Sequence, residues 1–226
     1  MKIGILQAGH VPEDLVEQNG DYDQIFSKML GGKGFDIKAW PVVDNVFPSG
    51  AYAADGWLIT GSRFGVYEDH AWIAPLENLI RDIHARGTPM IGICFGHQII
   101  AQALGGKVEK FAGGWAVGRT EYDMGDNTLT VNAWHQDQVI EPPQEARVLG
   151  GNAFCKNAVL AYGDNIWTMQ PHPEFSSQYL DGLIRIRGRG LVPDALLERA
   201  TETLNEPNSN DDIADFMVAF LNKARI

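Results

Sequence analysis

A lone cysteine, Cys94, stands between an apolar run and a helix-like run in the segment MIGICFGHQIIAQALGG, which extends from Met90 to Gly106. Gly92 and Gly96 flank it two residues away on either side. A sharp turn from a strand into a helix would bring backbones close together there, and glycine suits such crowding because it has no side chain. Cys94 would then lie at the apex of the turn, where helix N–H groups favour a thiolate and can hold an oxyanion. The pattern indicates a nucleophile, and the alternative is a buried cysteine that acts as a small hydrophobe.

A possible base lies farther along the chain, in the segment WTMQPHPEF. His172 is followed two residues later by Glu174, and a proline on each side of the histidine favours an extended backbone. Residues i and i+2 of an extended segment point the same way, so Glu174 can accept a hydrogen bond from one imidazole nitrogen while the other nitrogen faces the thiol. A nucleophile, a base and an orienting carboxylate are the parts of a catalytic triad.

The two motifs together resemble those of the class I, triad-type glutamine amidotransferases, whose domains carry G-x-C-x-G-x-Q and, later in the chain, H-P-E. In this chain they are GICFGHQ, ending at Gln98, and HPE, ending at Glu174. The segment LITGSRFGVYED resembles the oxyanion loop of that family, and AWHQDQV resembles its S-H-x-D-x-V segment, with Trp134 where serine is usual. The resemblance extends over roughly residues 1–180 and includes stand-alone glutaminase domains of the GMP-synthase type and γ-glutamyl peptidases.

The resemblance implies cleavage of a γ-glutamyl amide bond through a glutamyl thioester. Cys94 would attack the carbonyl carbon, and His172, oriented by Glu174, would protonate the departing nitrogen and then activate water. The backbone N–H groups of Gly61 and Phe95 would hold the oxyanion.

The substrate site is also implied by the resemblance. It assigns Gln98 to the α-amino acid end of the substrate and places Ser62, His135 and Asp137 nearby. A histidine or an aspartate in a strand can equally be a structural hydrogen-bonding group. We expect selectivity to depend on the loops Phe64–His70 and Phe111–Thr120, and the candidates for the pocket wall are Phe64, Tyr67, Trp72 and Trp115.

Two functions fit these residues. The chain is either a stand-alone hydrolase of glutamine or a γ-glutamyl compound, or a glutaminase subunit that supplies ammonia to a separate synthetase partner. The segment after the H-P-E motif carries no phosphate-binding loop, and we expect neither a cofactor nor a metal. The oxyanion segment GSRFGVYED, where many relatives have G-G-P, resembles stand-alone members and favours the first function.

Composition excludes several other classes of function. The 226 residues carry a formal net charge of −11, which argues against nucleic-acid or acidic-membrane partners. Only Cys94 and Cys155 are present, too few for a disulfide framework, and Cys155 has no partner motif. The apolar start of the chain is too short for a signal peptide, and no apolar run of about 18 residues could span a membrane. We therefore expect a cytoplasmic protein.

The elements that must position these residues follow an α/β pattern. Short apolar runs alternate with helical patterns, which predicts right-handed crossovers around a parallel sheet. The resemblance implies a flavodoxin-like fold, mostly parallel with helices on both faces. The predicted parallel strands are Ile3–Gln7, Ile37–Val43, Trp57–Thr60 and Met90–Ile93, and the predicted helices include Asp21–Leu30 and about 71–86. An antiparallel edge section is predicted from Lys107–Phe111, Leu129–Ala133, Ala146–Gly150, Ala158–Tyr162 and Ile166–Gln170.

The C-terminal part is predicted to be a helical extension, residues 181–226, packed on the amidotransferase-like domain of residues 1–180. Its last helix, capped near Asp211, carries an apolar stripe formed by Ile213, Phe216, Met217, Phe220 and Leu221. We expect this stripe to pack on its own domain, with a homodimer interface as the alternative. Arg185, Arg187 and Arg189 form a basic cluster, interpreted as a solvated or ion-paired face or, alternatively, as a patch for an anionic partner or substrate group.

Overall fold

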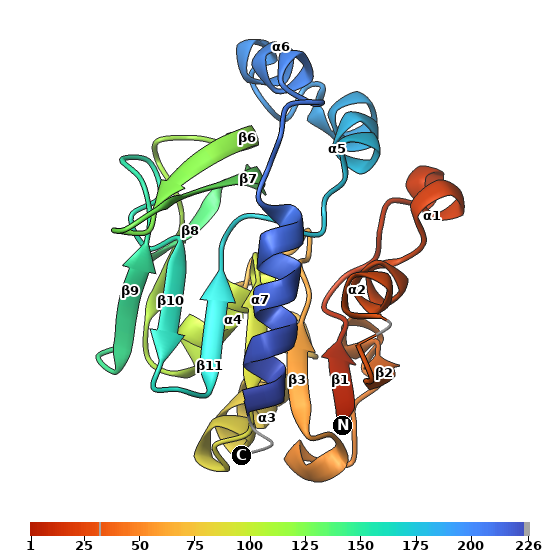
Figure 1. The fold of residues 1–226 in the computed structure, drawn as a ribbon, viewed down its shortest axis with the longest axis vertical. Coiled ribbons are helices and arrows are strands. Elements are labelled where there is room, and N and C mark those ends of the chain that lie inside the picture. The colour runs from red at the N-terminus through yellow and green to blue at the C-terminus, as the bar shows by residue number, and fades with distance from the viewer. Residues whose placement is uncertain (32, 224–226) are drawn as a thin grey trace.

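The centre of the fold is a seven-stranded sheet, formed within residues 1–31 and 33–223, which are those that the computed structural model describes. Its spatial order is β2-β1-β3-β4-β11-β10-β9 (Figure 1). From β2 to β11 neighbouring strands are parallel, whereas β10 and β9 are antiparallel additions at the edge. The strands are β1 (Lys2–Leu6), β2 (Asp36–Trp40), β3 (Gly56–Ile59), β4 (Met90–Ile93), β9 (Ala146–Gly150), β10 (Val159–Tyr162) and β11 (Ile166–Met169). The predicted α/β class, mostly parallel with an antiparallel edge, is confirmed.

Strand β11 corrects one detail of the prediction. The sequence pattern groups it with the antiparallel section, but it pairs in parallel with β4, with Trp167 opposite Ile91, and is antiparallel only to β10. All four of its residues are buried. A short strand buried on both faces has an apolar sequence whichever way its neighbour runs, so its residue types do not encode direction.

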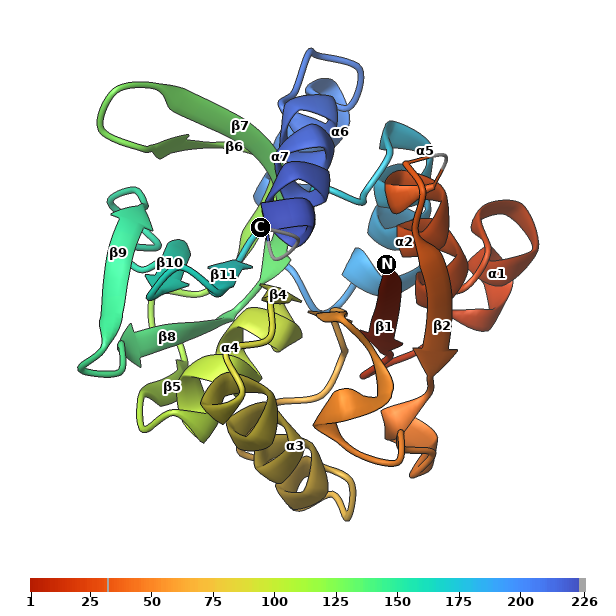
Figure 2. The ribbon, with the colours of Figure 1, turned by 60° about the horizontal axis from the view of Figure 1, so that its bottom comes forward.

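Two antiparallel ribbons lie outside the central sheet. One pairs β5 (Lys107–Lys110) with β8 (Asp137–Glu141), and the other pairs β6 (Ala116–Asp123) with β7 (Thr128–His135). Figure 2 shows the β6–β7 ribbon projecting from the antiparallel side of the molecule. The sequence interpretation missed β6 and β8, because both strands mix buried and exposed positions without a clear alternation.

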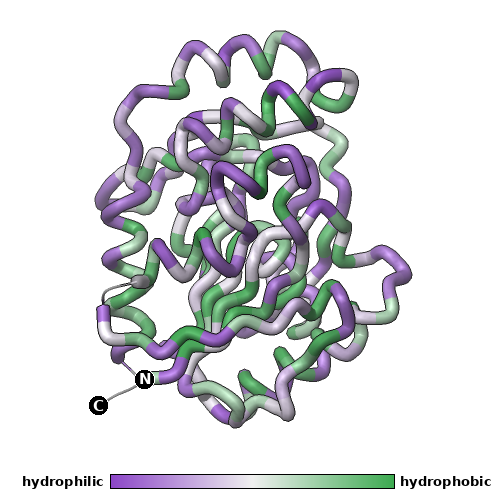
Figure 3. The backbone as a smooth tube through the Cα atoms, turned by 90° about the vertical axis from the view of Figure 1, so that its right-hand side faces the viewer, coloured by the Kyte–Doolittle hydropathy of each residue, from purple (hydrophilic) through white to green (hydrophobic). Residues whose placement is uncertain are grey.

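Helices cover both faces of the sheet. One apolar cluster joins α3 and α4 to one face, and a second joins α2 and α7 to the other. Hydrophobic segments accordingly gather in the strands at the centre of the molecule (Figure 3). The helices are α1 (Glu13–Asn19), α2 (Tyr22–Leu30), α3 (Ile73–Ala85), α4 (Phe95–Ala103), α5 (Ser177–Leu183), α6 (Asp194–Glu202) and α7 (Asn210–Asn222), with 3-10 turns at Val42–Asp44 and Ala51–Ala53 and a π-helical segment at Ile184–Gly188.

Local sequence explains where two of these helices begin. Asp21 caps α2 by accepting from the backbone N–H of Tyr22, and Gln24 completes a capping box by accepting from the N–H of Asp21. Pro75 lies in the first turn of α3, where a missing N–H costs no helical hydrogen bond. Helix α1 was not predicted, because it has seven residues and only Leu15 is buried.

A smaller third cluster lies at the end of the molecule where α5 and α6 are found. It joins Val117 of β6 to residues of α5, α6 and the segments between them, namely Leu180, Ile184, Val192, Leu197 and Ala200. Gly118 adopts a φ of +83° there, and a side chain on it would meet Ala200 of α6. The segment after α5 is therefore held against the β6–β7 ribbon rather than against the central sheet.

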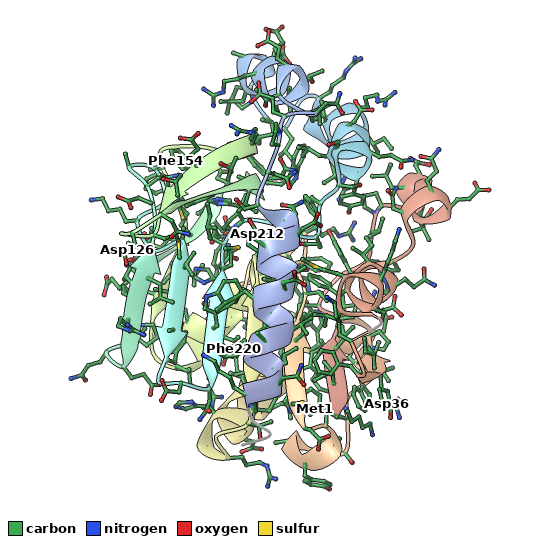
Figure 4. All side chains as sticks on the ribbon, in the orientation of Figure 1. Met1, Asp36, Asp126, Phe154, Asp212 and Phe220 are labelled. Atoms are coloured by element: carbon green, nitrogen blue, oxygen red, sulfur yellow. The ribbon has the colours of Figure 1, made fainter. Side chains whose placement is uncertain are left out.

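The last helix, α7, packs along the face of the central sheet, from Asp212 towards Phe220 (Figure 4). Met217 is fully buried and Phe220 nearly so, whereas Phe216 is 42% exposed. Most of the predicted stripe is thus covered by the chain itself, and the homodimer stays a prediction. Residues 224–226 of the predicted extension lie outside the described residues.

Truncating Met217 to alanine should destabilise the fold, because the cavity would lie between α7 and the sheet. We expect Met217→Ala to lower the free energy of unfolding by about 2–5 kcal/mol, measured by urea denaturation. Phe216→Ala, on the exposed side of the same helix, is the matched control and should cost clearly less. Equal losses in the two variants would contradict this packing.

Candidate active site

Cys94 occupies the sharp turn between β4 and α4 that the sequence predicts. Its φ of 52° and ψ of −102° lie outside the regions that side-chain-bearing residues favour. The backbone N–H of Cys94 donates to the carbonyl of Met169 on β11 at 2.8 Å, and the carbonyl of Cys94 accepts from the N–H of Gln98 at 3.0 Å. Strain of this kind persists only where the surroundings hold it in place, and it is concentrated at functional sites.

The flanking glycines are required by close backbone contacts. A side-chain carbon on Gly92 would lie 2.5 Å from the carbonyl oxygen of Gly96, and one on Gly96 would collide with the carbonyl of Ile59 on β3. The N–H of Gly96 also donates to the carbonyl of Thr60 at 3.1 Å. The start of α4 is therefore pressed directly against the end of β3, which fixes the position of the thiol.

His172 and Glu174 form a buried pair, with 2.7 Å between Nδ1 of the imidazole and Oε1 of the carboxylate. The loop that holds them is attached to β7, since the N–H of His172 donates to the carbonyl of Asn132 at 2.8 Å. The imidazole ring stacks on Phe175, with 3.9 Å between ring centroids and 9° between planes. The second oxygen of Glu174 has no hydrogen-bond partner within the described part of the chain, so the charge of this carboxylate is balanced chiefly by His172.

Opposing effects act on the charge of His172. Burial lowers its pKa, but the negative charges of Cys94 and Glu174, with hydrogen bonds to both, raise it from 6.5 to about 10. The ring is therefore an imidazolium at neutral pH. A cation beside the sulfur favours the thiolate, the nucleophilic form of cysteine.

The loop after β3 brings backbone donors to the same place. A side-chain carbon on Gly61 would lie 3.1 Å from Cε1 of His172 and 3.8 Å from Cβ of Cys94. Within the described residues, the backbone N–H groups of Gly61, Ser62 and Phe95 donate no hydrogen bond. Unused N–H groups on both sides of a thiol are what an oxyanion site needs, so the geometry is compatible with the predicted roles of Gly61 and Phe95.

A cavity of about 580 Å³ opens beside Cys94 and gathers most of the predicted site residues. Its lining includes Ser62, Cys94, Gln98, His135, Asp137 and His172. The amide nitrogen of Gln98 donates to the carbonyl of Asp137 at 3.0 Å and to the side-chain oxygen of Gln170 at 3.1 Å. Gln98 is therefore held in place by the protein while it faces the cavity.

His135 and Asp137 lie at the turn between β7 and β8. Burial and the positive charge of His172 lower the pKa of His135 to about 3, so this ring is neutral. Burial raises the pKa of Asp137, although the carboxylate accepts a hydrogen bond from the hydroxyl of Tyr67 at 3.0 Å. His135 is thus suited to hydrogen bonding, and Asp137 is the carboxylate available on this side of the cavity.

His97 and Cys155 lie away from the cavity lining. His97 is buried, with Nδ1 2.7 Å from the hydroxyl of Thr168, and burial lowers its pKa to about 3. Cys155 is buried as well, and burial raises the pKa of its thiol to about 12.

The cavity wall differs in part from the prediction. Phe64, Tyr67 and Trp115 line it, but Trp72 does not, because its ring is buried against Phe95 with 5.4 Å between centroids. The lining also includes residues that were not predicted from the sequence, among them His10, Pro12 and Tyr22 near the start of the chain, Leu183 at the end of α5, and Ile186 and Leu191 after it. Arg187 lies there too, and it belongs to the basic cluster whose alternative interpretation was a patch for an anionic partner or substrate group.

Two kinds of feature are absent from residues 1–31 and 33–223. No three His, Cys, Asp or Glu side chains are grouped there in a way that could hold a metal ion. No helix in the same ranges combines the length and the apolar character needed to cross a membrane.

Replacing His172 should slow chemical labelling of Cys94. His172→Gln removes the positive charge beside the sulfur, and we expect alkylation by iodoacetamide at pH 7 to be at least about tenfold slower. Because the pKa of His172 is about 10, the difference should shrink as the pH rises through that value and the native ring loses its proton. The label is located by peptide mass spectrometry, with Cys94→Ser as the blank. Equal rates at pH 7 would show that His172 does not activate the thiol.

The chain matches known proteins over most of its length. The family described as glutamine amidotransferase class-I matches residues 22–184. Gamma-glutamyl peptidase 2 of Arabidopsis thaliana is 28% identical over 220 residues, covering 91% of this chain and 89% of that protein. A glutamine-hydrolyzing GMP synthase subunit of Saccharolobus solfataricus is 32% identical over 170 residues, covering 71% and 87%. A crystal structure of a glutamine amidotransferase from Thermotoga maritima superposes with a TM-score of 0.78 at 19% identity, covering 98% and 97%. The chain belongs to the class I glutamine amidotransferase family.

Proposed function

We propose that the chain is a stand-alone hydrolase that cleaves the γ-glutamyl amide bond of a γ-glutamyl compound. The observation that carries this proposal is the cavity beside Cys94. It holds the residues predicted for a glutamyl group and continues to Trp115, Trp134 and the segment of residues 183–191. Glutamine releases only ammonia, so a site for glutamine alone does not need residues that contact a larger leaving group.

The chemistry begins with the thiolate of Cys94, which attacks the γ-carbonyl carbon and forms a tetrahedral intermediate. The N–H groups of Gly61 and Phe95 hold its oxyanion, a contact worth roughly 3 kcal/mol for each donor. The imidazolium of His172 gives its proton to the amide nitrogen, the C–N bond breaks, and the amine leaves. A glutamyl thioester on Cys94 and a neutral imidazole remain.

Water then completes the cycle. Neutral His172 takes a proton from a water molecule as the oxygen attacks the thioester carbonyl, and the C–S bond breaks. Glutamate leaves, and the thiolate and imidazolium are restored. Glu174 keeps the ring oriented through both halves of the cycle by its 2.7 Å contact with Nδ1. The substrate's α-ammonium group would pair with Asp137, and Gln98 would hold the same end of the molecule.

The names of the relatives support two functions, a stand-alone γ-glutamyl hydrolase and a glutaminase subunit of a synthetase. The Arabidopsis relative, which aligns with nearly the whole of this chain, is named a peptidase, and this favours an independent hydrolase of γ-glutamyl compounds. The alternative function is a glutaminase subunit that supplies ammonia to a synthetase, favoured by the relative named as part of a GMP synthase.

Removing the nucleophile should abolish activity without unfolding the chain. We expect Cys94→Ala to lower the release of amine from γ-glutamyl compounds by at least about 10⁴-fold, because no other group can form the thioester. Circular dichroism should show an unchanged fold. Cys155→Ala, the matched control at the chain's other cysteine, should retain activity. A fully active Cys94→Ala protein would overturn the proposal.

The two functions predict different substrates for the purified chain when no synthetase is present. We expect it to hydrolyse γ-glutamyl dipeptides with a kcat/KM at least about tenfold above that for glutamine, because binding energy from the leaving group can lower the barrier. Product glutamate is measured by a coupled assay. If the chain hydrolyses only glutamine, and does so only after a synthetase is added, the alternative is correct.

A further inference from the structure

The three arginines of the basic cluster after α5, Arg185, Arg187 and Arg189, have different surroundings in the structure. Arg185 forms an ion pair with Asp181, one helical turn earlier. Arg187 lines the cavity, and within the described residues it has no carboxylate partner. Arg189 is not part of the cavity wall. All three arginines are exposed, but Arg187 is the one that lines the cavity.

Close packing on both sides fixes the segment that carries Arg187. A side-chain carbon on Gly182 would lie 2.5 Å from Leu15 of α1, and one on Gly188 would lie 2.7 Å from Leu197 of α6 and 3.4 Å from Trp134 of β7. Between these glycines the chain forms the π-helical segment Ile184–Gly188. Such segments are rare and often lie at functional sites. Arg187 is thus carried by a rigid part of the wall.

The apolar neighbours of Arg187 point to a ligand with an apolar part. Leu183, Ile186 and Leu191 line the same cavity, and Ile186 and Leu191 are 41% and 56% exposed. Trp134 adds an aromatic surface from β7. Exposed apolar side chains that line a cavity are surfaces a ligand would cover.

The charged groups of the cavity are distributed unevenly. Its carboxylates are Glu68 and Asp137, and both have partners: Glu68 accepts from the N–H of Gly65 at 3.0 Å, and Asp137 accepts from Tyr67. The cationic side chains of Arg63 and Lys110 also line the cavity, and their charges act on Glu68 and Asp137, respectively. Arg187 lies on a different part of the wall, the segment after α5. Its positive charge has no carboxylate partner within the described residues. In a chain with a net charge of −11, such a site selects for a carboxylate.

We propose that Arg187 binds the carboxylate of the leaving group and that Leu183, Ile186 and Leu191 contact its side chain. This inference rests on the proposed function and names its substrate class: γ-glutamyl peptides in which the residue after the γ-glutamyl group is apolar, in preference to γ-glutamyl amines. In such a peptide the nitrogen that leaves carries both an apolar side chain and a carboxylate. Arg187 is a specificity-determining residue in this scheme and takes no part in proton transfer.

The test compares γ-glutamyl-leucine with γ-glutamyl-3-methylbutylamide, which differs only by the missing carboxylate. For the native chain we expect kcat/KM to be about 10- to 100-fold higher for the peptide, as for the loss of one charge-assisted hydrogen bond. Arg187→Gln should lower this ratio about tenfold or more, mainly through the KM of the peptide, and Arg187→Lys should lower it less. Arg189→Gln is the matched control and should leave the ratio unchanged. Both substrates are assayed on one preparation, so partial unfolding of a variant cancels from the ratio.

Two results would overturn the inference and leave the proposed function intact: equal kcat/KM for peptide and amide in the native chain, or the same fall in the ratio for Arg187→Gln and Arg189→Gln. In both cases the γ-glutamyl bond is still cleaved. If the native chain cleaves neither compound, nor any other γ-glutamyl amide, the proposed function fails and the inference fails with it.

Discussion

The contact on which the candidate site depends is that between the first turn of α4 and the end of β3. Because Gly96 lies directly against the carbonyl of Ile59, the chain must turn sharply at Cys94, with a positive φ. The hydrogen bond from Cys94 to Met169 adds β11 to this contact. The strand order β3-β4-β11 therefore places the thiol between the loop that carries Gly61 and the loop that carries His172. All three segments leave the same edge of the parallel part of the sheet, where ligands bind in open α/β folds.

Electrostatics gives two of the histidines that line the cavity, His135 and His172, opposite charge states. Burial lowers the pKa of His172, but its contacts with Cys94 and Glu174 raise that pKa to about 10, and the positive charge of this ring helps to lower the pKa of His135 to about 3. Near neutral pH the His172 ring therefore carries a proton that it can donate, whereas the His135 ring is neutral. Glu174 has a single hydrogen-bond partner within the described residues, the imidazole of His172. Its negative charge therefore acts mainly on the ring that it orients.

Residues whose local geometry is dictated by their type could be predicted from the sequence. The glycines around Cys94 constrain the backbone wherever they occur, so the sharp turn there was predictable. The extended backbone predicted from His172 to Glu174 was wrong, because Pro173 and Glu174 form a turn that is closed by a hydrogen bond from the N–H of Phe175 to the carbonyl of His172. The predicted contact between His172 and Glu174 is nevertheless present. The wall of the cavity was not predictable. Trp72 packs against Phe95 rather than facing the cavity, and the position of Arg187 depends on how α5 packs on α1. Both depend on contacts between segments far apart in the chain, which neither periodicity nor spacing encodes. The direction of β11 was missed for a similar reason, since a fully buried strand has the same residue types in either direction.

The third apolar cluster, between the β6–β7 ribbon and α6, has an evolutionary consequence. It supports the segment after α5 but contains none of the residues that position the thiol, which are anchored in the central sheet. Substitutions in this cluster can reshape one wall of the cavity while Cys94 and its flanking glycines keep their places in the central sheet. Substrate selectivity can therefore change in small steps, provided that β7 still holds the loop of His172.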